Sequence, residues 1–148
     1  MNTAGSLDGT NAGGHDAIAL RVTPSGKVSW ARQVGTSADD RAADVAVQPD
    51  GTADAAVFTS GAFAAPAGDV DVVLLRLSDK GKLLTATQFG TARADGGDPF
   101  AEENMYLGNG SGGLWLTGLT YGSLAGQPNQ GSGDVFVTRL DPATGDPE

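Results

Sequence analysis

Acidic side chains gather in two loops of the sequence, where their oxygen atoms could bind a calcium ion. Calcium takes about six to eight oxygen ligands, which loop carboxylates commonly supply. The first loop contains Asp39, Asp40 and Asp44, and the second contains Asp95, Asp98, Glu102 and Glu103. Neither has the Asp-x-Asp-x-Asp-Gly spacing of an EF-hand. The two interpretations are a calcium site using Asp39, Asp40, Asp44, Asp95 and Asp98, and loop acids that are only solvated.

His15 is the only histidine of the chain, so a Ser-His-Asp hydrolase site would have to use it. It lies in a glycine-rich loop that resembles two later loops without a histidine, which disfavours a catalytic role. The chain has no cysteine, and this excludes disulfides, zinc–thiolate sites and thiol catalysis. The residues favour a protein without enzymatic activity, with a hydrolase as the weaker alternative.

One segment of the chain occurs three times, and it carries an aspartate and an arginine at the same places in each copy. The aspartates are Asp16, Asp71 and Asp134, at intervals of 55 and 63 residues, and the arginines are Arg21, Arg76 and Arg139. Each aspartate stands before an apolar run in a glycine-containing loop, which is typical of a carboxylate that accepts backbone N–H bonds. Each arginine, five residues later, falls on the opposite strand face and could contact an adjacent repeat. Because all three copies share both residues, we expect an architectural role.

Short apolar runs separated by glycine-containing turns predict four antiparallel strands in each full repeat. Pro or Asp early in the turn and Gly late predicts a type I turn closed by a left-handed glycine. The predicted strands are 17–22, 28–36, 44–47 and 53–58 in the first repeat, 72–77, 83–91, 105–107 and 114–118 in the second, and 135–140 in the third. Thr59 to Phe63 and the matching segments 3–7 and 120–124 lie outside these strands. Each is predicted to form a loop that buries one large apolar side chain.

Tandem four-stranded units are the plan of β-propeller blades, so we predict an all-β fold of this kind, with an open β-sandwich as the alternative. The single domain, 1–148, divides into repeats 3–58 and 59–119 and a partial repeat 120–148. A propeller has roughly four to eight blades. We therefore expect either a fragment of a longer propeller or a ring completed by self-association or by a protein partner.

The charge of the chain excludes some partners. There are 9 basic and 18 acidic residues, for a net charge of −9. Nucleic acid and anionic membranes both require cationic patches, so we expect neither as a partner. No apolar run approaches the roughly 20 residues of a membrane-spanning helix. The first residues lack the basic and apolar regions of a signal peptide. This leaves a cytoplasmic chain or, as we expect, a piece of a longer secreted protein.

Several segments of the sequence resemble, in their order and spacing, the bacterial β-propeller repeats often called SBBP. They are Gly13–Trp30, Gly35–Asp40, Val45–Thr52 and Leu114–Thr120. The small residues of 53–57 depart from the usual larger apolar ones. The resemblance implies a bacterial protein that is secreted or exposed on the cell surface, often large, with no common enzymatic activity.

Two functions follow as expectations. The first is a non-enzymatic scaffold or protein-interaction module. The second is a carbohydrate-binding, lectin-like module with ligand sites between repeats. Its sugar-stacking candidates are Trp30, Tyr106, Trp115 and Tyr121. The two tryptophans fall within predicted strands, which favours packing over sugar binding.

Overall fold

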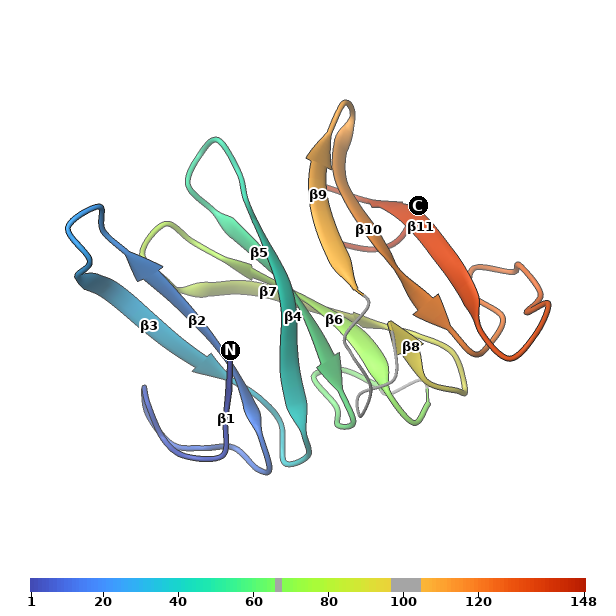
Figure 1. Ribbon diagram of the computed structural model, residues 1–148, viewed down its shortest axis with the longest axis horizontal. Coiled ribbons are helices and arrows are strands. Elements are labelled where there is room, and N and C mark those ends of the chain that lie inside the picture. Colours follow the sequence, from blue (N-terminus) through green and yellow to red (C-terminus); the bar gives the residue numbers. More distant parts are fainter. Residues whose placement is uncertain (66–67, 97–104) are drawn as a thin grey trace.

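The computed structural model describes residues 1–65, 68–96 and 105–148, and it consists of three antiparallel β-sheets of three or four strands (Figure 1). The first sheet has the order β1-β2-β3, from β1 (Asn2–Thr3), β2 (Asp16–Val22) and β3 (Val28–Val34). The central sheet has the order β4-β5-β6-β7, from β4 (Asp40–Val47), β5 (Ala53–Thr59), β6 (Asp71–Leu77) and β7 (Leu83–Phe89). In the third sheet β11 (Asp134–Leu140), β8 (Asp95–Gly96) and β9 (Tyr106–Gly110) all pair with β10 (Gly113–Thr120). The prediction of an all-β fold is confirmed, and no helix occurs in these three ranges.

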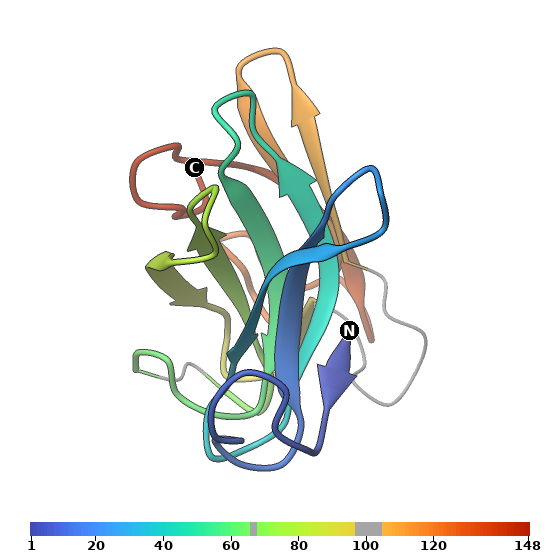
Figure 2. The ribbon, with the colours of Figure 1, turned by 90° about the vertical axis from the view of Figure 1, so that its left-hand side faces the viewer.

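The sheets lie side by side in chain order, with the first sheet in front of the central one when viewed from its own side (Figures 1 and 2). Each hairpin is formed within a repeat, but the sheets join hairpins from different repeats. The central sheet combines the third and fourth strands of 3–58 with the first and second strands of 59–119. The sequence repeat and the structural sheet therefore have the same length but begin at different strands.

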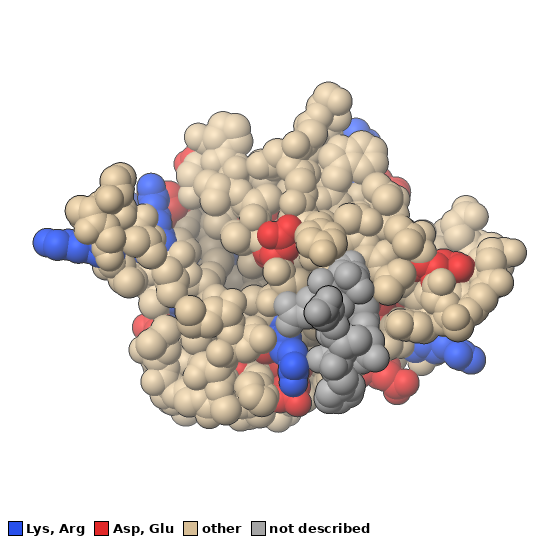
Figure 3. Space-filling view, viewed as in Figure 1, with Lys and Arg blue, Asp and Glu red and all other residues tan. Residues whose placement is uncertain are grey.

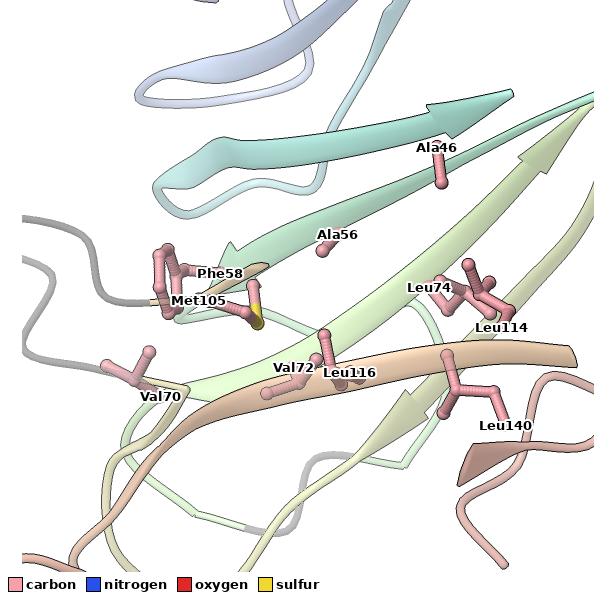
Figure 4. Close-up of a cluster of buried hydrophobic side chains, with 10 residues drawn as sticks. All are labelled: Ala46, Ala56, Phe58, Val70, Val72, Leu74, Met105, Leu114, Leu116 and Leu140. Atoms are coloured by element: carbon pink, nitrogen blue, oxygen red, sulfur yellow. The ribbon is translucent and has the colours of Figure 1, made fainter. Parts of the chain in front are cut away.

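The central sheet is buried on both faces because successive strand residues point to opposite sides. Ala55 and Val57 of β5 join a cluster shared with the first sheet, whereas Ala56 and Phe58 join one shared with the third. The second cluster contains Ala46, Ala56, Phe58, Val70, Val72, Leu74, Met105, Leu114, Leu116 and Leu140 (Figure 4). The two apolar layers, rather than any single repeat, form the core.

The predicted turns are present, with small changes at strand ends. Gly26, Gly81 and Gly145 have φ of 80°, 77° and 79°, in the left-handed region expected for a closing glycine. β4 begins at Asp40, four residues earlier than the predicted strand at Asp44. β9 and β10 form the hairpin predicted there, but it closes more tightly than the predicted loop over 108–113 because its glycines adopt positive φ.

Each second strand ends two residues before the predicted boundary, because its next residue passes against the anchor aspartate. A Cβ on Gly35 would lie 2.2 Å from Oδ1 of Asp16, so this close approach requires glycine. The following residue, Thr36, leaves the ladder and donates its N–H to Asp40.

The predicted apolar plugs are less buried than expected. Phe63 is half-buried and packs on the cluster between the first and central sheets, and Leu124 is also half-buried. Leu7 is exposed, so the prediction of a buried side chain is wrong at this position. Within the described ranges there is no helix with the length and apolar character needed to cross a bilayer.

Candidate functional site

The anchor aspartates close the loop in front of each repeated strand. Asp16 and Asp71 are buried, whereas Asp134 is half-buried. Oδ2 of Asp16 accepts hydrogen bonds from Ala12 N at 2.9 Å and Gln33 Nε2 at 2.8 Å. Asp71 accepts one from Gln88 Nε2 at 2.7 Å, and Asp134 accepts one from Gln130 N at 2.6 Å. These contacts hold a loop against its own hairpin, which is the arrangement that the repeated Asp suggests.

The repeated arginines connect one sheet to a turn of the next. Arg21 Nη1 donates to Asp79 O at 3.0 Å, and Arg76 Nη1 donates to Pro142 O. Asp79 and Pro142 occupy the same place in the turns after β6 and β11. The third, Arg139, has no described sheet beyond it and instead forms an ion pair with Glu148.

Arg76 differs from Arg21 in having a carboxylate partner on the neighbouring strand. Its Nε lies 2.7 Å from Oδ1 of Asp54, which is directly opposite in the β5–β6 ladder and completely buried. Gln48 Nε2 donates to the other oxygen of Asp54 at 2.9 Å. Sequence reasoning missed this buried ion pair because it depends on the pairing of strands from different repeats.

Asp40 and Asp95 of the acidic loops occupy equivalent structural positions. Asp40 is fully buried and accepts bonds from Thr36 N and Thr59 Oγ1, each at 2.5 Å. Asp95 accepts bonds from Thr91 N and, at 2.5 Å, from Thr120 Oγ1. The recurrence of these threonines in both repeats was the available signal. The oxygens of both carboxylates are thus occupied by internal donors.

The other predicted calcium ligands are dispersed. Asp39 bonds to His15, and Asp44 accepts bonds from Val45 N and Leu107 N, both at 2.8 Å. Asp98, with Glu102 and Glu103, lies outside the described residues. Among the residues that are described, no three acidic or histidine side chains come together as a metal-binding group. The geometry therefore gives no support to a calcium site.

His15 pairs with one loop acid, Asp39. Its Nδ1 lies 2.8 Å from Oδ1 of Asp39, and hydrogen bonds from His15 lower the pKa of that carboxyl. In the described parts of the chain, no serine or threonine hydroxyl is hydrogen-bonded to the ring. Within the part of the chain that the structure describes, the His and Asp of a triad are thus together without a hydroxyl bonded to the ring.

Asp40 should make stability depend on pH. Burial raises its pKa above the ordinary 3.8, outweighing the hydrogen bonds from Thr59 and Thr36 that lower it. The folded protein thus binds this proton more tightly than the unfolded chain, so the stabilisation is present below pH 3.8 and is lost as the pH rises through the folded pKa. We expect the free energy of unfolding of the parent, minus that of Asp40→Asn, to fall as the pH rises from about 3 to 6.

Asp50 provides a control of opposite sign. Hydrogen bonds from Thr52 lower the pKa of this exposed carboxyl, so its stabilising contribution is lost as the pH falls. The corresponding difference for Asp50→Asn should therefore rise with pH. Urea unfolding at several pH values measures both, and a pH-independent difference for Asp40→Asn would contradict the assignment.

An apolar groove of about 530 Å³ lies between the first and central sheets. The surface is hollowed there in Figure 3, between the sheet on the left and the centre of the molecule. The side of β2 contributes Leu20, Arg21 and Val22, with Trp30 of β3 behind them. The opposite wall comes from β4 and β5, and its exposed apolar residues are Val45 and Val47.

Equivalent positions in β2 and β6 show why the groove is open. Leu20 is 37% exposed, whereas its counterpart Leu75 is 2% exposed; Val22 is 50% exposed, whereas Leu77 is completely buried. β5 pairs with β6 along its whole length, but the two residues of β1 pair only with the first two residues of β2. The rest of β2 therefore has backbone groups along its groove side with no neighbouring strand, in contact with an apolar surface.

The predicted sugar-stacking aromatics do not form one group. Trp30 packs on Gly81 of the central sheet, and its Nε1 donates to Asp79 O at 3.0 Å, so it contributes to packing between sheets. Tyr106 and Trp115 are 56% and 38% exposed. Their pairing places them diagonally on the same face of the β9–β10 hairpin.

Comparison with known proteins adds no assignment: no protein-family model matches the chain, and no curated protein matches it either.

Proposed function

We propose that this protein is a non-enzymatic protein-interaction module whose binding surface is the groove beside β2. The single observation that carries the proposal is the coincidence, at one place, of an open strand edge and an exposed apolar surface. Either feature alone promotes association, because unpaired backbone groups and apolar area both gain from being covered. Addition of a strand to an open edge is also an established mode of peptide recognition.

We propose that the three antiparallel sheets, of three or four strands each, are successive propeller blades rather than parts of an open sandwich. Under it the module is part of a larger scaffold, and the resemblance to SBBP repeats favours a bacterial protein that is secreted or displayed at the surface. A module of this kind uses its repeated Asp and Arg for construction, which agrees with their contacts to loops and turns.

The test is a screen of the purified protein against a display library of extended peptides and, in parallel, against a glycan array. We expect peptides to be enriched and to compete with one another for one site. Failure to select any peptide that binds the purified protein would contradict the proposal.

Glycan binding is the second candidate, supported by the aligned and exposed Tyr106 and Trp115. An aromatic ring that stacks on a sugar needs such an exposed face. In the same screen, a glycan signal that disappears in both Tyr106→Ala and Trp115→Ala would favour this function over peptide binding.

A further inference from the structure

We infer that the cleft between the outer strands of the first and central sheets binds a sugar acid, with the carboxylate of the ligand between Arg32 and Lys82. The cleft has a volume of about 420 Å³ and lies between β3 and the start of β7. This volume falls near the lower end of the range for small-molecule pockets. The cleft shares no lining residue with the groove beside β2, so the inference goes beyond the proposed function.

The two cations of the cleft come from different sheets. Arg32 belongs to β3, and its Nε donates to Gly81 O at 3.0 Å, which fixes the guanidinium beside a turn of the central sheet. Lys82 follows Gly81 in that turn, is exposed and also lines the cleft. Among the described residues, none of the ion pairs includes Lys82. A guanidinium and an ammonium at one cleft can hold a carboxylate by charge-assisted hydrogen bonds.

The junction between the central and third sheets shows that the architecture does not require these charges. Thr87 occupies the place of Arg32, and its Oγ1 likewise donates to a carbonyl of the next turn, that of Thr144. Asp146 occupies the place of Lys82, since each carbonyl closes its turn by accepting the N–H of the residue just after the strand. A neutral residue and an acid thus serve at one junction where two cations stand at the other. The cations are therefore available for ligand binding rather than required for construction.

The other walls of the cleft suit the remainder of a sugar. Val34 and Leu83 supply apolar surface, and Thr10 supplies a hydroxyl that has no hydrogen-bond partner among the described residues. A sugar ring has an apolar C–H face and several hydroxyls, so it can contact both kinds of wall. Peptide recognition instead relies mainly on the backbone of one strand edge, whereas this cleft is lined by residues of two sheets and a loop.

Two aspartates lie near the expected carboxylate. Asp8 Oδ2 is 3.5 Å from Arg32 Nη1, and both side chains are substantially exposed, so this ion pair is weak. A ligand carboxylate that reaches Arg32 would compete with Asp8. Asp16 also lines the cleft, but it is buried, and its Oδ2 already accepts bonds from Ala12 N and Gln33 Nε2.

The experiment titrates the whole protein with D-glucuronate and, as the matched uncharged ligand, with D-glucose, and follows backbone amide signals by NMR. We expect glucuronate to shift the signals of Lys82 and Leu83 saturably, and added salt to weaken this binding. Glucose should bind at least about tenfold more weakly, because it lacks the carboxylate.

Variants that take the residue types of the second junction test the two cations. Arg32→Thr and Lys82→Asp should each weaken glucuronate binding by at least about tenfold. Lys27→Asp is the matched control, because it makes the same charge change at the equivalent turn position of the first sheet, away from the cleft. It should leave the affinity unchanged within about twofold. Asp8→Asn should tighten binding, because it removes the competing carboxylate.

Three results would overturn the inference. One is glucose binding as tight as glucuronate binding, and another is glucuronate binding that Arg32→Thr and Lys82→Asp leave unchanged. The third is tighter binding of the dipeptide Ala-Ala than of glucuronate, which would assign the cleft to the carboxyl terminus of a peptide. All three would leave the proposed interaction function standing, because that function uses the groove beside β2.

Discussion

The Leu75→Ala variant is expected to unfold with a free energy about 3 kcal/mol lower than that of the parent protein, because the deletion leaves a cavity in a packed layer. Leu75 is 2% exposed and belongs to the cluster between the first and central sheets. Its surroundings come from different strands of both sheets, so they cannot easily collapse into the space. Urea or thermal unfolding followed by circular dichroism measures the change.

Leu20→Ala is the matched control, since Leu20 occupies the same place in β2. It is 37% exposed at the edge of the groove, and its loss should lower the free energy of unfolding by less than about 1 kcal/mol. Equal losses at the two positions would mean that the groove is filled in solution, and would contradict the open edge described for β2.

The second large effect is expected at the buried ion pair. Asp54→Ala should lower the free energy of unfolding by about 3–5 kcal/mol, because it leaves the mostly buried guanidinium of Arg76 without its carboxylate. It also removes the acceptor of Gln48 Nε2. Chemical denaturation measures the loss.

Arg139 and Glu148 form the comparison, because Arg139 is the repeat equivalent of Arg76. Both of their side chains are substantially solvent-accessible, so Glu148→Ala should change the free energy of unfolding by about 0–1 kcal/mol. The double variant Asp54→Ala/Arg76→Ala should lose less free energy of unfolding than the sum of the losses in the two single variants. Strict additivity would show that Asp54 and Arg76 are not coupled.

Local features of the chain were well predicted from sequence. The apolar runs form strands, and glycines at 26, 81 and 145 close the turns with positive φ, since these outcomes depend on neighbouring residues. The repeat also drew attention to Asp16 and Arg21, which contact a loop and a turn of the next sheet, respectively. The prediction failed at Leu7, whose side chain is exposed rather than buried in its loop.

The sequence by itself determined the strands, the turns and the repeated residues of this protein. Only the tertiary structure decided which hairpins share a sheet, and this joined Asp54 to Arg76 across two repeats while leaving Arg21 without such a partner. It also made Leu75 core and Leu20 surface, although the two residues have the same local sequence context. The physical reason is that burial and ion pairing depend on what lies across the ladder and on the next sheet, and a periodic sequence carries no signal for a neighbour that differs from copy to copy.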